Sequence, residues 1–329
     1  MFSFPLILIS NLMIIFSKSF FFMWMIMEIN LIGFISILMM NKFIYMEKIM
    51  IFFLIQSFNS HMFFMSNLMM NFNLFSNSLL IIIFFSILSK MGMPPFHLWY
   101  LNLMKSLNWM IFFFNSSIQK FIPLMILNFY MIKNLNMFKF LIMLILIISS
   151  IIPLYSINTL SLKLIMSFSA MIQISWIMMM MLINELTWII YFFIYNFISF
   201  SMYYIFFLFN INYTFNMNLN NLNNKIFLYF ISLQFLSLAG LPPFTGFLNK
   251  WLFINISFNN LSIYLNSIIL ISSLLNLFYY IRTMIQISVF FYLKNNFKIN
   301  YMKYMNFMNL KISLIIMNSL MMLMFYEFI

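Results

Sequence analysis

The sequence predicts an all-α polytopic membrane protein with about eleven transmembrane helices that include an inverted repeat. Of the 329 residues, 65% are hydrophobic and only 6% are charged, whereas soluble domains carry about 25% charged residues. Apolar runs of the length that crosses a bilayer, about 20 residues, follow one another along the chain. A five-residue motif that should break a helix also occurs twice, 148 residues apart.

The composition excludes several classes of function. The chain has no cysteine, which rules out disulfides, thiolate metal sites and cysteine nucleophiles. The net charge is +12, but the lysines are scattered singly between apolar runs and form no basic stripe, which argues against nucleic-acid binding. The sequence has no Gly-rich phosphate loop, and its two histidines lack metal-ligand spacing. We therefore predict no metal site and no cofactor-binding site.

The apolar segments predict a single transmembrane domain over residues 1–329. Asn-rich or Lys-bearing breaks separate the segments, which cover residues 2–17, 20–40, 49–70, 77–104, 107–132, 138–157, 162–182, 187–210, 226–253, 260–286 and 311–328. The predicted inverted repeats are approximately 20–157 and 162–286, with terminal helices at 2–17 and 311–328.

The lysines predict the orientation of these helices. Loops after the even-numbered segments hold nine lysines, and the other loops hold three. By the positive-inside rule, the N-terminus is inside and Glu327 is outside. The abundance of Met, at 37 residues, is typical of an AT-rich mitochondrial gene that reads ATA as Met. The expected location is the mitochondrial inner membrane, with the N-terminus in the matrix.

The repeated motif predicts a break in the fourth and in the ninth segment. It reads "GMPPF" and then "GLPPF", and its helix-breaking residues are Gly92, Pro94, Pro95, Gly240, Pro242 and Pro243. Proline removes a backbone donor and clashes with the preceding turn. Two broken helices of opposite direction in corresponding halves are typical of inverted-repeat transporters. The alternative is a pair of purely structural kinks.

A few charged residues remain at membrane depth, where each costs roughly 2.5–3.5 kcal/mol. They are Glu28, Lys90, Lys120 and Lys250, and His97 is a candidate relay just after the first break. A desolvated lysine loses its preference for the charged form, and a nearby carboxylate restores it. A lysine with a glutamate partner is therefore a switchable proton site. The alternatives are a structural carboxyl group and lysines whose stems reach the interface.

Five segments resemble a known family. One is "NTLSLKLIMSFSAMIQISW", residues 158–176, which resembles the loop and helix that lie between the two broken helices of that family. "WMIMEINLIGF" around Glu28, "KMGMPPFHLW" from Lys90, "IQKFIPL" around Lys120 and "LSLAGLPPFTGFLNKW" up to Trp251 are similar to the antiporter-like membrane subunits of respiratory complex I (NADH:ubiquinone oxidoreductase). Within these, the chain resembles the subunit 2 family, which is related to Mrp-type cation/proton antiporters.

The resemblance implies which functions belong to this chain and which belong to other subunits. It implies a proton channel coupled to electron transfer from NADH to ubiquinone, with Glu28 and Lys90 as the switchable pair, Lys120 as the central relay and Lys250 as the link to the exit or to the next subunit. It places NADH, ubiquinone, FMN and iron–sulfur clusters in other subunits, so that this chain performs no redox chemistry. The expected partners are subunits 4 and 4L, accessory subunits and membrane lipids such as cardiolipin.

The chain departs from the family pattern at three positions. Lys163 stands where arginine is common, Gln173 where histidine is common, and Asn249 replaces a usual proline. A proton role for that histidine cannot be carried over to Gln173. Two other functions stay open, namely a free-standing cation/proton antiporter and a non-pumping structural spacer of the membrane arm, and the residues alone do not distinguish protons from sodium.

Overall fold

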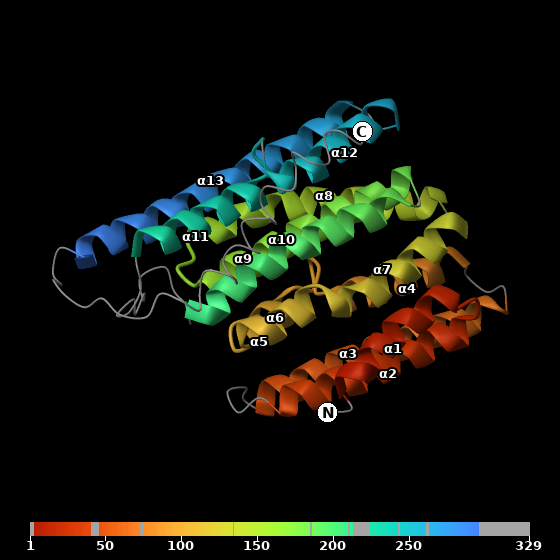
Figure 1. The fold of residues 1–329 in the computed structure, drawn as a ribbon. Coiled ribbons are helices and arrows are strands. Elements are labelled where there is room, and N and C mark those ends of the chain that lie inside the picture. The colour runs from red at the N-terminus through yellow and green to blue at the C-terminus, as the bar shows by residue number, and fades with distance from the viewer. Residues whose placement is uncertain are drawn as a thin grey trace. The chain divides into compact units, whose positions relative to one another are not determined.

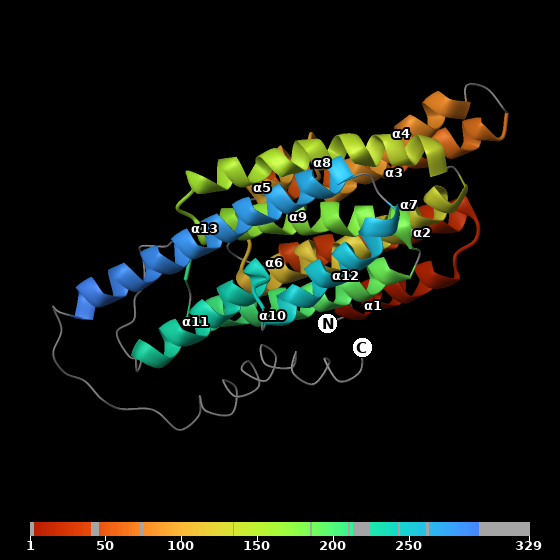
Figure 2. The same ribbon diagram turned by 90° about the horizontal axis from the view of Figure 1, so that it is seen from above.

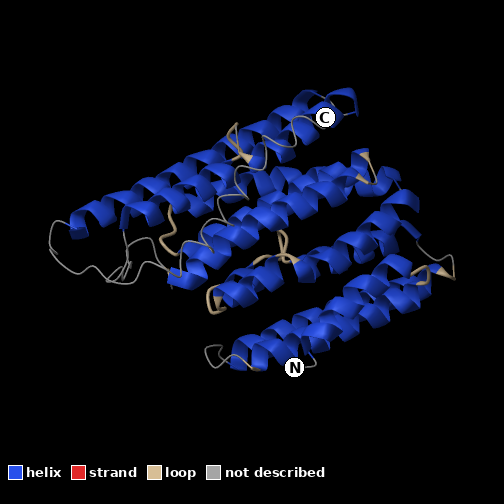
Figure 3. Ribbon diagram, in the orientation of Figure 1, coloured by secondary structure: helices blue, strands red, loops and turns tan. Residues whose placement is uncertain are grey.

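The computed structural model of the chain is mostly helical in the part that it describes. The described residues are 3–40, 46–72, 76–133, 135–184, 186–209, 211–212, 224–242, 244–260 and 263–295. The predicted terminal helix at 311–328 lies outside them. Figure 3 shows helices joined by short loops.

The helices follow the apolar segments of the sequence. A 3-10 turn, Ile14–Phe16, continues the first of them. In chain order the α-helices are α1 Ser3–Met13, α2 Phe20–Met39, α3 Met46–Met70, α4 Ser76–Met91, α5 Leu98–Met104, α6 Trp109–Ser116, α7 Ile118–Lys133, α8 Leu135–Ile157, α9 Leu162–Ile183, α10 Thr187–Phe209, α11 Asn224–Ala239, α12 Thr245–Asn260 and α13 Ile263–Asn295.

Six segments of the described residues are long and apolar enough to cross a membrane. They are Phe20–Met39, Met46–Met70, Trp109–Ile132, Leu162–Ile183, Thr187–Leu208 and Asn266–Val289. The shorter apolar helices include Ser3–Phe16 and Asn77–Met91. The prediction of many apolar helices is therefore confirmed, while the number eleven stays a prediction.

The chain forms two compact units, Met1–Ile148 and Ser149–Ile329, and the division falls inside α8. In the first unit, α2 packs against α1, α3 and α7, and α3 packs against α4 and α5 (Figure 1). Helix α7 also packs against α4 and α6. These contacts bring Glu28 of α2, Lys90 of α4 and Lys120 of α7 into one neighbourhood.

In the second unit, α10 packs against α9, α11 and α12 (Figure 2). Helix α13 packs against α11 and α12, and α12 also contacts α9. The side chains of α9 are buried along almost its whole length, as expected of a helix that is apolar on every face.

The two repeated motifs end their helices in the same way. Gly92 and Gly240 have φ angles of 66° and 67°, in the left-handed region that favours glycine. In the first unit, the amide of Gly92 donates to the Ser89 carbonyl and the next amide, of Met93, donates to the Leu88 carbonyl.

The second motif repeats these bonds 148 positions later. The amide of Gly240 donates to the Ser237 carbonyl and that of Leu241 donates to the Leu236 carbonyl. This paired arrangement with a left-handed glycine is the Schellman C-cap. The following prolines cannot continue the helix, and regular helix resumes only at Leu98 in the first unit and at Thr245 in the second.

Candidate functional site

Glu28 lies on α2 in the first unit, with its side chain half-buried. Its carboxylate accepts a hydrogen bond from the hydroxyl of Ser60 on α3. Met27, Asn30 and Leu31 line a cavity beside it, because residues three and four positions apart share one face of a helix. Glu28 is thus held next to that cavity by its own helix and by α3.

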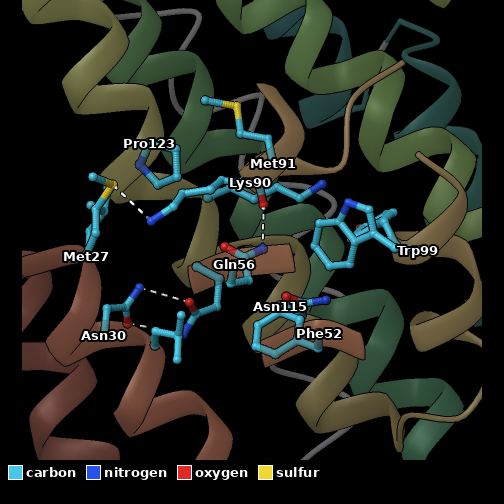
Figure 4. A pocket seen from close by; sticks show the side chains of 14 residues that line it. Met27, Asn30, Phe52, Gln56, Lys90, Met91, Trp99, Asn115 and Pro123 are labelled. Carbon is cyan, nitrogen blue, oxygen red and sulfur yellow. Dashed lines mark hydrogen bonds between the residues drawn. The ribbon is translucent and has the colours of Figure 1, made fainter. Parts of the chain in front are cut away.

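Lys90 lies in the last turn of α4 and is buried, with 8% of its surface exposed. Its Nζ lies 3.3 Å from the Met27 sulfur, which is a weak acceptor. Glu28 is near enough to interact with it electrostatically. The backbone carbonyl of Lys90, released by the break, accepts a hydrogen bond of 3.0 Å from Gln56 Nε2, as Figure 4 shows.

Lys120 lies in the first turn of α7 and is also buried, with 3% of its surface exposed. Its Nζ lies 4.1 Å from the centroid of the Tyr100 ring, a distance at which a cation and an aromatic face attract each other. Within the described part of the chain, this Nζ has no hydrogen-bond partner. The ammonium group of Lys120 therefore faces only a π system and the cavity beside it.

One cavity in the first unit is lined by both Lys90 and Lys120. It has a volume of about 30 Å³, which is enough for one or two water molecules. Figure 4 shows its lining side chains from α2, α3, α4, α5, α6 and α7. They are Met27, Asn30, Leu31, Phe52, Gln56, Lys90, Met91, Trp99, Tyr100, Asn115, Gln119, Lys120, Ile122 and Pro123. We call this space the Lys90–Lys120 cavity.

Amide side chains form one wall of the Lys90–Lys120 cavity. Asn30 Nδ2 donates to Gln119 Oε1 over 2.8 Å, and Gln119 Nε2 donates back to Asn30 Oδ1 over 3.1 Å. This reciprocal pair links α2 to α7 immediately before Lys120. Pro123 has no N–H to donate to the Gln119 carbonyl four residues earlier, so the first turn of α7 keeps a backbone acceptor near the cavity.

The second unit contains a smaller cavity of about 20 Å³ around Lys250 on α12. Lys250 Nζ donates a hydrogen bond of 2.5 Å to the Ala239 carbonyl at the end of α11. Its side chain passes over Gly240, where a Cβ would lie 2.6 Å from Lys250 Cε. The lining is rich in polar groups and includes Gln173, Tyr191, Ser237, Asn249, Ser273 and Asn276.

The two departures from the family pattern at Gln173 and Asn249 both fall on this second cavity. Gln173 Oε1 accepts a hydrogen bond of 2.6 Å from the Tyr191 hydroxyl. Asn249 is buried, and its Oδ1 has no hydrogen-bond partner among the described residues. Pro243, another residue predicted for the second break, lies outside the described residues.

Three further predicted residues, Pro94, Pro95 and His97, do not line the Lys90–Lys120 cavity. Pro94 and Pro95 follow the cap at Gly92, and His97 immediately precedes α5. The His97 ring nitrogen Nδ1 lies 3.2 Å from the Pro95 carbonyl. The structure therefore brings Glu28, Lys90 and Lys120 together in the first unit and gives Lys250 a cavity of its own in the second.

Sequence reasoning missed most of the uncharged residues that line the Lys90–Lys120 cavity. Asn30 and Gln119 are polar residues inside apolar runs, each within two positions of a predicted charged residue, and that placement could have identified them. Gln56 could have been found as one of the polar residues that recur along one face of α3. Tyr100 carried no signal, since an aromatic residue in a membrane helix is ordinary.

Comparison with known proteins identifies the family. Residues 17–276 match the family described as the transmembrane region of NADH:quinone oxidoreductase and Mrp antiporter subunits. The chain belongs to this family. The match contains Glu28 and the three lysines of the two cavities, Lys90, Lys120 and Lys250.

Relatives within the NADH:quinone oxidoreductase/Mrp antiporter family confirm the expected resemblance to subunit 2. The chain is 33% identical over 304 residues to the NADH-ubiquinone oxidoreductase chain 2 of Anopheles gambiae, an alignment that covers 88% of this chain and 86% of the relative. It is 30% identical over 285 residues to the same subunit of Lumbricus terrestris, covering 85% and 84%.

Solved structures support the fold. Respiratory complex I from Thermus thermophilus contains a chain that matches with a TM-score of 0.70 at 13% identity, covering 82% of this chain and 66% of that one. The Mrp complex from Dietzia sp. DQ12-45-1b matches with a TM-score of 0.74 at 13% identity, covering 86% and 58%. The chain is thus a multi-pass membrane protein with the antiporter-like helical fold, and it is shorter than these structural neighbours.

Proposed function

We propose that the chain is a membrane-arm subunit of the proton-translocating NADH:ubiquinone oxidoreductase of the mitochondrial inner membrane, and that it conducts protons. The observation that carries this proposal is the Lys90–Lys120 cavity, where two buried ammonium groups share one small polar space beside a glutamate. Buried charged groups inside membrane helices are costly and are typical of proton and ion pathways.

Glu28 and Lys90 form the switchable pair of this proposal. An electrostatic interaction between them favours the ionised glutamate and the protonated lysine together. Separating the pair weakens this interaction and releases the Lys90 proton to the cavity. The sulfur of Met27, the nearest acceptor at 3.3 Å, is too weak to retain it.

Lys120 is the relay in this proposal. Its Nζ faces the Tyr100 ring and the cavity, and water in a space of about 30 Å³ would connect it to Lys90. Lys250, in the second unit, would then pass protons toward the exit or the neighbouring subunit. The hydrogen bond from Lys250 to the Ala239 carbonyl uses one of the three ammonium protons and leaves the other two for transfer.

The proposal extends to topology and partners. Eleven spans, two inverted repeats with Pro-broken helices and a matrix-side N-terminus are parts of it, and so are contacts with subunits 4 and 4L. Redox cofactors, NADH and ubiquinone would be bound by other subunits, and lipids such as cardiolipin would contact this one. The matching Schellman caps at Gly92 and Gly240 support the repeats, because each leaves a helix interrupted next to a cavity.

Replacement of Lys120 tests the proposal. Lys120→Met keeps much of the stem volume and removes the titratable group, so the rate of proton pumping coupled to NADH oxidation should fall at least about 100-fold, the lower range for a proton-transfer group. Pumping is measured in membranes after assembly of the complex has been checked. Lys18→Met, which changes an exposed lysine before α2, is the matched control and should pump normally.

Two results would redirect the interpretation. Normal pumping by an assembled Lys120→Met complex would make the chain a structural spacer of the membrane arm. The matching family includes Mrp antiporter subunits, which makes a free-standing cation/proton antiporter the second candidate. That candidate requires the chain to purify apart from a large redox complex and to exchange cations without NADH.

A further inference from the structure

The hydroxyl of Ser60 lies within hydrogen-bond distance of two different acceptors. One is the carboxylate of Glu28 on α2, and the other is the backbone carbonyl of Ser57, at 2.6 Å in its own helix. A serine hydroxyl has one proton, so it can donate to only one of them at a time. Ser60 is completely buried, with no exposed surface.

The protonation state of Glu28 decides which acceptor Ser60 uses. An ionised carboxylate only accepts hydrogen bonds, and so the Ser60 proton must point to Glu28. A protonated carboxyl group carries its own O–H, which donates to the Ser60 oxygen. The Ser60 hydroxyl then rotates and donates to the Ser57 carbonyl, without gaining or losing a proton.

We propose that Ser60 is a positioning residue that follows the proton on Glu28, so that the carboxyl group keeps a hydrogen-bond partner both when it holds the proton and when it has released it. This inference deepens the function proposed above and rests on the proton-transfer role of Glu28 given there. A buried polar group without a hydrogen-bond partner is destabilising. A carboxyl group that cycles between two charge states inside a membrane is therefore stabilised by a neighbour that can hydrogen-bond to it in both states.

The charged surroundings of Glu28 come from several helices. Lys90 of α4 is the cation that interacts with it electrostatically. Helix α1 carries no titratable side chain, and on α3 the exposed His61 follows Ser60 directly. The other titratable groups on α3 and α7 are Glu47, Lys48, Lys120, Tyr130 and Lys133. Ser60 is the hydroxyl that touches the Glu28 carboxylate.

The test compares single and double variants in membranes that contain the assembled complex. Ser60→Ala should slow coupled proton pumping roughly 10-fold, the loss expected when a hydrogen bond to a charged group is removed, and should shift the pH profile of pumping. Ser60→Thr should restore both readouts, because a threonine hydroxyl can use the same carbonyl of its helix. Ser66→Ala is the matched control, since Ser66 is buried on the same helix and, among the described residues, donates to the Met62 and Phe63 carbonyls of its own helix.

The double variant separates this inference from the proposed function. In a Glu28→Gln background, Ser60→Ala should cause no further loss and no shift of the pH profile, because interacting residues are not additive. If Glu28→Gln abolishes pumping while Ser60→Ala leaves it normal, the role of Ser60 is wrong and that of Glu28 stands. If Ser60→Thr pumps as slowly as Ser60→Ala, the hydroxyl of Ser60 has no role in pumping. If Glu28→Gln pumps normally, the proposed roles of both Glu28 and Ser60 are wrong.

Discussion

Among the membrane lysines, Lys250 differs from Lys90 and Lys120 in its hydrogen-bond partner. It donates to the Ala239 carbonyl, which the break after α11 leaves without its helical partner. In the first unit, the corresponding task of satisfying a released carbonyl falls to Gln56, which donates to the Lys90 carbonyl. Lys250 therefore stabilises the end of α11 through this hydrogen bond and also carries a titratable group.

This difference predicts distinct phenotypes for two lysine substitutions. Lys250→Met should destabilise the assembled subunit by about 1.5–3 kcal/mol, because a hydrogen bond from a charged donor to a buried carbonyl is lost. Lys120→Met should leave stability nearly unchanged, since Lys120 Nζ donates no hydrogen bond within the described residues. The stability of each variant is measured by heating the complex and monitoring the loss of the subunit from the membrane arm. Equal midpoint temperatures for the two variants would contradict the structural role of Lys250.

At the residue scale, the charged residues of the site could be predicted from the sequence, but the side chains that contact them could not. Glu28, Lys90 and Lys120 stood out because an ionisable residue in an apolar run is conspicuous and expensive. Ser60 and Tyr100 did not stand out, because serines and aromatic residues occur throughout the membrane helices of this chain. Their roles depend on which helices pack together, and that information is absent from the local pattern.

At the scale of the element, the helix containing Lys120 was predicted incompletely. The sequence predicted one continuous segment over 107–132, whereas the structure has α6 ending at Ser116 and α7 beginning at Ile118. Ser117 between them has φ −117° and ψ −77°. The run Asn115-Ser116-Ser117 is a cluster of turn-forming residues that could have revealed the interruption, but it lacks the glycine and proline that mark the other two breaks. Lys120 therefore lies one turn after a break, as Lys90 lies one turn before one.

The breaks also constrain how helices pack, and Gly246 is the sharpest example. Gly246 on α12 lies against the end of α11, where a Cβ would approach the Ser237 carbonyl oxygen to 1.7 Å. That oxygen also accepts the Gly240 amide in the Schellman cap. A side chain at this position cannot be accommodated by rotating a neighbour, because the obstructing atom belongs to the backbone.

Gly246→Ala should therefore displace α12 from α11 and reduce the amount of assembled subunit by at least about 5-fold, an effect that overpacking of about 1–3 kcal/mol would produce. Gly33→Ala on α2 is the matched control. Its Cβ would lie 3.0 Å from Ile7 Cγ1, a side-chain atom that can move, and assembly should be nearly normal. Quantifying the subunit in purified membranes decides the matter, and equal amounts for the two variants would show that α11 and α12 are not held as described.

At the scale of the whole molecule, each of the two units contains a lysine cavity beside a helix that ends in a Schellman cap. The predicted inverted repeat accounts for the recurrence of this arrangement, since the same motif in helices of opposite direction would place one break in each half. The antiporter-like fold of the chain could be predicted from the repeated Gly-Xaa-Pro-Pro-Phe motif and from the charged residues at membrane depth. The division at Ile148, inside α8, was not predictable, because no change in composition marks it.

The orientation in the membrane that we propose from the lysine distribution can be tested directly. Lys18 lies between the first two predicted spans and Lys105 lies after the fourth, and both side chains are exposed. The positive-inside rule puts Lys105 on the matrix side and Lys18 on the opposite side. Because the chain has no cysteine, Lys18→Cys and Lys105→Cys each introduce the only thiol on it.

In intact inner-membrane vesicles with the matrix face enclosed, an impermeant maleimide should label the Lys18→Cys variant and not the Lys105→Cys variant. In inverted vesicles it should label the Lys105→Cys variant and not the Lys18→Cys variant. The reverse pattern would invert the whole topology and exchange the sides to which the two cavities connect.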